Sequence, residues 1–296
     1  MNILITGAWQ DAKARIPEIE AAGHSVAFLQ QEKDDVPVPC EWVEGIICNG
    51  FFLYHPIEKF SSLRYIQLTS AGFDRVPMDY VTQHGITIYN ARGVYSIPMA
   101  EFALSGVLQL YKQARFFEEN RRAHKWEKHR GLMELYGKNA CIVGCGSVGT
   151  ECAKRFAAFG CSVTGVDMFP RSDENYREML PLEKLDGALE KADVVVLTLP
   201  LTDETRGMMN CERLSLLKES AVIVNIARGA VVDTDALIDA LPRIGGAVLD
   251  VFEDEPLGAD SPLWDMENAI VTPHNSFVGE GNAARMWDVI KKNLIG

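Results

Sequence analysis

Residues 139–167 read NACIVGCGSVGTECAKRFAAFGCSVTGVD, and the order of features in this stretch decides the fold. An apolar run at 140–143 predicts a buried strand, and a glycine-rich loop follows it. Apolar residues then recur at helical intervals up to Phe156, and a second apolar run ends at Asp167. Strand, glycine loop, helix, strand and acid are the parts that a dinucleotide-binding βαβ unit requires.

The three glycines of the loop have the spacing G-x-G-x-x-G, and each meets a separate physical need. Gly144 allows the tight turn, Gly146 lets the backbone approach a pyrophosphate, and Gly149 lets the helix pack on the strand. The first N–H groups of the helix face the phosphates, and Asp167 can accept hydrogen bonds from ribose hydroxyls. Glycines also serve plain tight turns, but the coincidence of all these parts predicts a dinucleotide cofactor.

The composition is that of an ordinary soluble globular protein, with 47% apolar and 24% charged residues among 296. This length favours two domains. The formal net charge of −12 argues against nucleic acid and against an anionic membrane surface as partners. One basic cluster is the exception, and we interpret it as cations at the end of a helix rather than as a binding patch. Its members are Arg121, Arg122, Lys125, Lys128 and Arg130.

Seven cysteines are present, with no C-x-x-C pair among them. Several fall on predicted strands or helix faces, where a free cysteine behaves as a small apolar residue, so we expect neither a metal site nor a disulfide framework. The first residues, MNILITGAWQDAK, predict a strand and a turn rather than a signal peptide, and no apolar run reaches membrane-spanning length. We therefore expect a cytoplasmic protein.

The pattern on either side of the glycine loop predicts an α/β protein with two doubly wound parallel-sheet domains. The first domain, residues 1–92, has no glycine fingerprint of its own and is expected to be a flavodoxin-like substrate domain. The second, residues 93–274, is the expected Rossmann NAD-binding domain, and it opens on a long helix at 97–119 with Ser96 as its cap. Residues 275–296, with a final helix predicted at 279–294, belong to the first domain. The predicted strands of the first domain are 2–6, 25–29, 45–48, 65–68 and 86–89, and those of the second are 140–143, 163–166, 193–199, 221–226, 247–251 and 269–271.

Two loops of the first domain follow predicted strands, at the edge where ligands of open parallel sheets bind. The loop that starts at Asn49 is rich in aromatic residues, which pack against the other domain if they do not face a ligand. His55 in this loop is as well explained by a surface or capping role as by ligand binding. The loop at 69–74, TSAGFD, has small residues whose N–H groups could bind a carboxylate.

Three stretches of the second domain place titratable groups directly after apolar strands. They are NIARG at 225–229, LDVFEDEP at 249–256 and TPHNS at 272–276. Arg228 alone could be a surface ion-pair residue, and His274 alone a loop residue without a function. Around one dinucleotide site, however, the set matches what carbonyl reduction needs.

Reduction of a carbonyl by a nicotinamide requires a proton for the oxygen as negative charge develops. A histidine suits this task because its ordinary pKa lies near neutrality. A neighbouring carboxylate orients the imidazole and favours its protonated form. An arginine can bind a substrate carboxylate and polarise the carbonyl with its planar fork of donors.

The chain resembles the NAD-dependent, phosphoglycerate dehydrogenase-like D-2-hydroxyacid dehydrogenase family over essentially its full length. The resemblance rests on several motifs in the right order: SAGFD, IPMAEF, ELYGK ahead of GCGSVG, LPLTDETRG, NIARG, DVFEDEP and TPH. It implies hydride transfer between NAD(H) and a 2-keto acid or D-2-hydroxy acid in a cleft between the domains. It also implies a homodimer.

The resemblance assigns roles to individual residues. Arg228 would bind the substrate carboxylate and carbonyl, and His274, paired with Glu255, would be the proton donor in reduction and the base in oxidation. The N–H groups of Ala71 and Gly72 would bind the substrate carboxylate. The implied cofactor-binding residues are Gly144, Gly146, Ser147, Val148, Gly149, Asp167, Leu199, Pro200, Thr205, Ile226, Ala227 and, near the nicotinamide carboxamide, Asp250.

Some alternatives stay open at this point. Asp167 favours NAD because its carboxylate repels the 2′-phosphate of NADP, but Arg171 keeps some use of NADP open. Glu255 argues against the related branch that oxidises formate, which pairs its histidine with glutamine. The competing function is a non-catalytic NAD(H)-sensing protein that resembles a corepressor. Two departures from the family pattern concern the aromatic loop after Asn49 and the end of the chain near Leu294, where relatives continue into a segment that packs back on the first domain.

Overall fold

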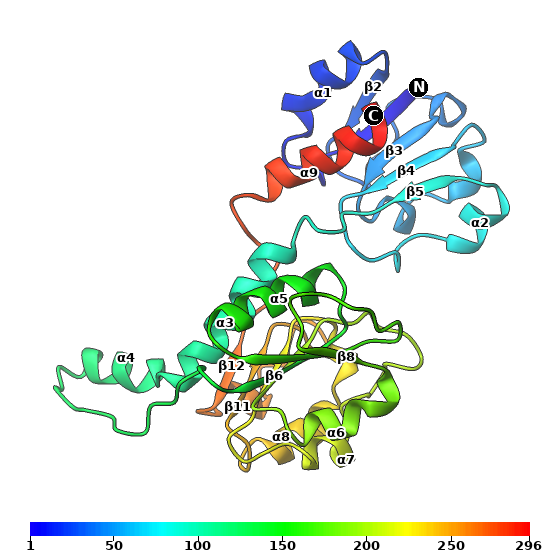
Figure 1. Cartoon of the computed structure of the whole chain (residues 1–296). Helices are drawn as coiled ribbons and strands as arrows, with labels where there is room; N and C mark the ends of the chain where they lie inside the picture. Colours follow the sequence, from blue (N-terminus) through cyan, green and yellow to red (C-terminus); the bar gives the residue numbers. More distant parts are fainter. The chain divides into compact units, whose positions relative to one another are not determined.

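The computed structural model describes all 296 residues, and the chain forms two compact units. Unit 1 consists of Met1–Tyr95 together with Gly279–Gly296, and unit 2 consists of Ser96–Val278. Each unit contains one parallel β-sheet with helices on both faces (Figure 1). The α/β fold class with two doubly wound sheets is therefore confirmed. The unit boundaries fall a few residues beyond those that we expected at 92 and 274.

Unit 1 has the strand order β2-β1-β3-β4-β5 with all pairs parallel, which is the flavodoxin-like order. Every residue of β3 and β4 is buried, as expected for central strands that are covered on both faces. Helices α1 and α9 pack on one face, and α2 packs on the other. The bounds are β1 Asn2–Thr6, α1 Ala12–Ala21, β2 Ser25–Leu29, β3 Gly45–Cys48, β4 Tyr65–Leu68, α2 Met78–Gln83, β5 Thr87–Tyr89 and α9 Asn282–Ile290.

The end of the chain packs on unit 1. Trp287 of α9 stacks on Trp9 with ring centroids 5.9 Å apart, and the Asn293 side chain donates a 2.9 Å hydrogen bond to the buried Gln67. Ile290 and Leu294 join the same apolar cluster as β1. The last helix thus packs on the first sheet, in the unit to which we assigned residues 275–296.

Unit 2 has seven parallel strands in the order β12-β11-β10-β9-β6-β7-β8. Beginning at β8, this is the Rossmann order, with β12 added at the far edge. The switch point lies between β6 and β9, which are neighbours in the sheet but distant in sequence. The bounds are α3 Ser96–Tyr111, α4 Ala114–Arg122, β6 Asn139–Val143, α5 Ser147–Ala158, β7 Ser162–Val166, β8 Glu178–Leu180, α6 Leu185–Leu189, β9 Val194–Leu197, α7 Cys211–Ser215, β10 Val222–Asn225, α8 Thr234–Ala240, β11 Gly246–Leu249 and β12 Ala269–Val271.

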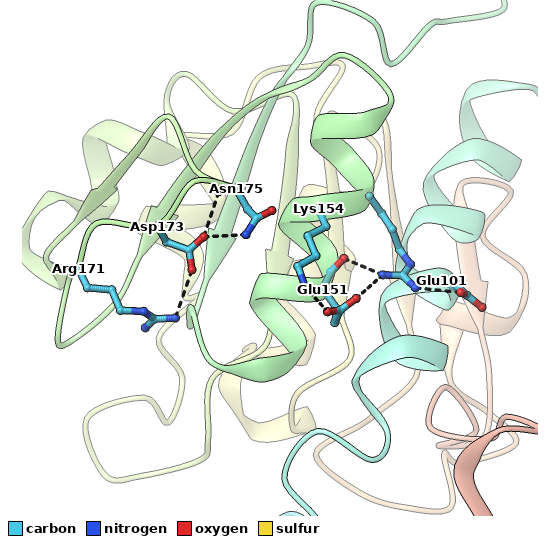
Figure 2. Close-up of polar contacts among 7 residues, drawn as sticks. Glu101, Glu151, Lys154, Arg171, Asp173 and Asn175 are labelled. Atoms are coloured by element: carbon cyan, nitrogen blue, oxygen red, sulfur yellow. Dashed lines mark hydrogen bonds and ion pairs between the residues drawn. The ribbon is translucent and has the colours of Figure 1, made fainter. Parts of the chain in front are cut away.

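Alternate residues of the unit 2 strands face two separate apolar clusters, one under α3 and α5 and the other under α6, α7 and α8. Helix α3 approaches the sheet closely, because a Cβ atom on Gly106 would lie 2.5 Å from the side chain of Val248. Charged residues tie α3 to α5: Arg155 contacts Glu101 at 2.9 Å and Glu151 at 2.7 Å (Figure 2). These contacts hold the helix that follows the glycine loop.

The prediction of one continuous helix at 97–119 was wrong, because two helices cover this range. The chain breaks between α3 and α4 at Gln113, whose φ of 53° is left-handed. Ser96 is the first residue of α3 rather than a cap outside it. The basic cluster begins at the end of α4, where Arg121 and Arg122 both contact Glu118, at 2.7 and 2.8 Å. No helix of the chain has the length and apolar character that crossing a membrane requires.

Candidate active site

The glycine loop between β6 and α5 has the geometry that its spacing predicts. Gly144 has φ of 94°, and a Cβ atom there would lie 2.6 Å from the backbone nitrogen of Leu199. A Cβ atom on Gly149 would lie 2.1 Å from the carbonyl oxygen of Gly144, so only glycine lets the helix approach the loop. A Cβ atom on Gly146 would meet no atom within 4 Å, and the loop is open at this position.

Helix α5 begins directly behind this loop and has a free N-terminus. Its N-cap, Gly146, is extended and has no side chain to satisfy the first turn. The N–H groups of Ser147 and Val148 therefore have no intrahelical partner. Exposed N–H groups at the positive end of a helix are suited to binding a pyrophosphate.

Asp167 lies at the end of β7, next to the glycine loop. Its carboxylate accepts the backbone N–H of Cys145 at 2.6 Å and that of Phe169 at 2.9 Å. Arg171 donates to the carbonyl of Cys145 at 2.8 Å and lies 3.8 Å from Asp173. Figure 2 shows Arg171 turned toward Asp173. A cation thus lies beside the loop together with the acid that we assign to the ribose.

Cys145 lies inside the glycine loop, where it is buried. Its side chain is fully buried, and this burial raises the pKa of its thiol to about 12. No cysteine of the chain forms a disulfide, and no group of three or more His, Cys, Asp or Glu side chains is arranged to hold a metal ion. The cysteines near the loop, including Cys141 and Cys152, are core residues.

The loop after β9 lies against the glycine loop. Leu199 is buried against Gly144, as described above. The Thr205 hydroxyl donates to the Pro200 carbonyl at 2.8 Å and accepts the N–H of Thr202 at 2.7 Å. The hydroxyl therefore shapes the turn that presents Leu199 and Pro200. A direct contact between Thr205 and the cofactor stays a prediction.

The NIARG loop after β10 is held by its own asparagine. The Asn225 side chain accepts the N–H of Ala227 at 3.1 Å and donates to the carbonyl of Arg228 at 3.0 Å. A Cβ atom on Gly229 would lie 1.8 Å from the backbone carbon of Phe252, so the loops after β10 and β11 touch backbone to backbone. Ile226 is buried beneath this contact, and the loop presents the half-buried Arg228.

His274 and Glu255 form a pair in unit 2. The Nδ1 atom of His274 lies 2.9 Å from Glu255 Oε2, and the other carboxylate oxygen accepts the N–H of Phe252 at 3.1 Å. The carboxylate is thus fixed at both oxygens, and it holds the Nδ1 side of the imidazole. The histidine side chain is 43% exposed, so its Nε2 side can meet a substrate.

The buried Asp250 organises the loop that carries His274. Its carboxylate accepts the Thr272 hydroxyl and the Asn275 N–H, both at 2.7 Å, and the Ser276 N–H at 2.8 Å. The backbone oxygen of Asp250 also accepts the N–H of His274, whose φ of 50° is left-handed. These hydrogen bonds give the carboxylate a positioning role that sequence reasoning missed. A contact of Asp250 with the nicotinamide carboxamide stays a prediction.

In unit 1, the loop at 69–74 presents the expected backbone donors. No hydrogen-bond acceptor of the chain is paired with the N–H groups of Ala71 and Gly72. The loop is held from behind, because the side chain of Asn90 donates to the Ala71 carbonyl at 2.6 Å and the Tyr95 hydroxyl donates to the carbonyl of Thr69. Two neighbouring N–H groups on a braced loop can bind a carboxylate.

The aromatic loop after β3 has a mixed environment. Phe51 is fully buried and packs on Phe60, whereas Leu53 and Tyr54 are more than half exposed. His55 stacks on Phe51 at 4.4 Å, and its Nε2 lies 2.8 Å from the backbone oxygen of Glu32. His55 therefore stabilises the loop, and nothing in its contacts points to a ligand.

The family model of the D-isomer specific 2-hydroxyacid dehydrogenases, NAD binding domain, matches residues 104–276. The chain belongs to this family. It is 36% identical over 248 residues to a glyoxylate reductase of Korarchaeum cryptofilum, an alignment that covers 80% of this chain and 74% of the relative.

Two further proteins, one of them with a solved structure, are similar to the chain. An (S)-sulfolactate dehydrogenase of Chromohalobacter salexigens is 34% identical over 237 residues, which cover 78% of this chain and 76% of the relative. The crystal structure of a family member from Xanthobacter autotrophicus Py2, in complex with NADPH and MES, matches with a TM-score of 0.80 at 32% identity and covers 99% and 94% of the two chains.

These findings make the chain an oxidoreductase, an NAD-dependent 2-hydroxyacid dehydrogenase that acts on small 2-keto and 2-hydroxy acids. They support the enzyme and not the alternative of a corepressor-like NAD(H) sensor. NAD is the cofactor of the family domain, and the NADPH in the Xanthobacter structure leaves use of NADP open.

Proposed function

We propose that the chain reduces a 2-keto acid to the D-2-hydroxy acid with NADH, or catalyses the reverse, with His274 as the acid and base. The observation that carries this proposal is the 2.9 Å pair of His274 and Glu255. Glu255 fixes the ring and Arg228 binds the carboxylate and the carbonyl of the substrate. In unit 1, Ala71 and Gly72 donate their N–H groups to the substrate carboxylate.

When bound, the nicotinamide supplies or accepts the hydride at the carbonyl carbon. In reduction, His274 gives its Nε2 proton to the oxygen on which negative charge develops. Glu255 holds the Nδ1 side, so Nε2 is the nitrogen available to the substrate. The guanidinium of Arg228 stabilises the same developing charge. In oxidation, Nε2 removes the hydroxyl proton.

The cofactor contacts follow from the open glycine loop. The N–H groups of Ser147 and Val148 bind the pyrophosphate, and Asp167 accepts the ribose hydroxyls in place of its present backbone donors. Leu199, Pro200, Ile226 and Ala227 line the path toward the nicotinamide. This assignment favours NAD over NADP.

Asp167→Ala is expected to raise the ratio of kcat/KM for NADPH to that for NADH by about tenfold or more. The change removes the carboxylate that repels a 2′-phosphate and leaves Arg171 beside the loop. Initial rates with both cofactors measure the ratio. In the double variant with Arg171→Ala the gain should be smaller, because the attraction of the cation for the 2′-phosphate is then lost as well. An unaltered ratio in Asp167→Ala means that this acid does not bind the ribose.

We also propose a homodimer and a cytoplasmic location. Large apolar side chains on and after α4 are exposed, among them Trp126 at 99% and Tyr136 at 81%, and a surface of this kind usually contacts a partner. A second copy of the chain is the expected partner by family resemblance. Seven free cysteines fit a reducing compartment.

A panel of 2-keto acids tests the proposed reaction. We expect NADH consumption with at least one of glyoxylate, hydroxypyruvate, pyruvate and the branched 2-keto acids. Chiral chromatography of the product should give the D isomer. Tight binding of NADH without turnover of any of these acids would contradict the proposed reaction and favour a non-catalytic NAD(H)-sensing protein.

A further inference from the structure

A carboxylate of unit 1 occupies backbone donors at the edge of the sheet where substrate is expected. Glu32 follows β2, and its Oε1 atom accepts the Asn49 N–H at 2.6 Å and the hydroxyl of the buried Thr6 at 2.8 Å. Its Oε2 atom accepts the N–H of Gly50 at 2.7 Å. Three donors therefore hold one internal anion.

This anion lies beside the proposed carboxylate site. Thr6 ends β1 and Asn49 follows β3, and β3 pairs directly with β4, which leads into the loop of Ala71 and Gly72. Neighbouring strands lie about 4.8 Å apart, so the two loops are close along the sheet edge. Arg75 links them, because it donates to the Asn49 side chain at 3.3 Å.

The same two loops line an open cavity of about 450 Å³. Phe52, Leu53 and Ile57 line one side, and Val76 and Pro77 line the other. The charged residues of the lining are Glu58, Asp74 and Arg75, and Glu32 contacts the loop from behind. The cavity thus offers apolar walls and more negative than positive charge.

We infer that Glu32 is a specificity-determining residue that restricts the enzyme to 2-keto acids whose group beyond the carbonyl carbon is uncharged. This inference rests on the proposed function. A second anionic group, such as a carboxylate, phosphate or sulfonate, finds the N–H groups of Asn49 and Gly50 already neutralised by Glu32. It also meets repulsion from that carboxylate. An uncharged side group meets the apolar walls without this repulsion.

A purely structural role for Glu32 would have a different effect on ligand affinity from a role in specificity. A brace that only stabilises the loop affects charged and uncharged ligands alike, so its loss leaves their relative affinity unchanged. The ratio of two affinities within one variant therefore separates the two roles, and partial destabilisation of the variant cancels from it.

The test uses oxaloacetate and its 4-amide, which have nearly the same shape and differ in one negative charge. Titration calorimetry on the NAD⁺-loaded protein gives a Kd for each without turnover. For the unaltered protein we expect the amide to bind at least about tenfold more tightly. In Glu32→Gln the preference should fall below about threefold.

Glu44→Gln is the matched control. Glu44 also accepts a backbone N–H, that of Asn2 at 2.8 Å, but at the opposite edge of the same sheet. This variant should keep the full preference. Equal binding of the two compounds by the unaltered protein, no binding of the amide, or an unaltered preference in Glu32→Gln would overturn the inference.

Reduction of glyoxylate, measured in parallel, tests the proposed function separately. Glyoxylate has no side group, so Glu32 does not decide its use. Turnover of glyoxylate with equal affinities for the matched pair refutes the specificity role alone. Absence of all keto-acid turnover with the expected affinity ratio refutes the proposed reaction alone.

Discussion

His274→Ala is expected to lower kcat for keto-acid reduction by a factor of about a hundred or more and to leave the Kd of NADH nearly unchanged. The imidazole is the proton donor of the proposed reaction. Its partner Glu255 cannot replace it, because both oxygens of that carboxylate already accept hydrogen bonds. Steady-state rates with the best substrate of the panel give kcat. Fluorescence titration with NADH gives the Kd.

Two companion variants sharpen this test. Glu255→Gln keeps a hydrogen bond to the ring but removes the charge, so its kcat should lie between those of the unaltered enzyme and His274→Ala. His84→Ala is the control, because His84 is exposed on unit 1 beside α2 and stacks on Tyr80. It should have the full kcat. An undiminished kcat in His274→Ala removes this residue from the mechanism.

Arg228→Ala is expected to lower kcat/KM for the keto acid by about a hundredfold or more. The loss combines weaker binding of the substrate carboxylate with weaker stabilisation of the charge that develops on the carbonyl oxygen. Arg228→Lys restores the charge without the planar fork, so its kcat/KM should be intermediate. Initial rates over a range of substrate concentrations give kcat and KM for each variant.

The control for Arg228 is Arg177→Ala, a loss of one exposed cation from the segment that precedes β8. It separates the effect of net charge on an anionic substrate from the effect of a direct contact. If both variants lower kcat/KM to the same small extent, Arg228 contributes only long-range attraction. A normal kcat/KM in Arg228→Ala contradicts the proposed contact.

The strands of both sheets could be predicted from the sequence because buried parallel strands form continuous apolar runs between turn residues. The edge strand β8, at Glu178–Leu180, was missed because it is short and begins with a charged residue. The break between α3 and α4 was missed for a different reason. Apolar residues continue through Phe116 and Phe117, and the left-handed conformation of Gln113 has no signal in the sequence.

In the candidate site, too, some features could be predicted from the sequence and others could not. The glycine loop could be located from spacing alone, because each glycine has a local steric reason. Asp250 and Glu32 could not be understood in this way. Their carboxylates accept N–H groups from residues that are distant along the chain, and no local pattern indicates which donors a half-buried or buried acid will meet.

The close approach of Gly229 to Phe252 has a mechanical consequence. Side chains can change rotamer, but two backbones in direct contact move only together. Arg228 is joined to one of these backbones, and Glu255, which accepts the N–H of Phe252, is joined to the other. The backbone segment that carries Arg228 therefore keeps a fixed spacing from the segment that holds Glu255, the partner of His274.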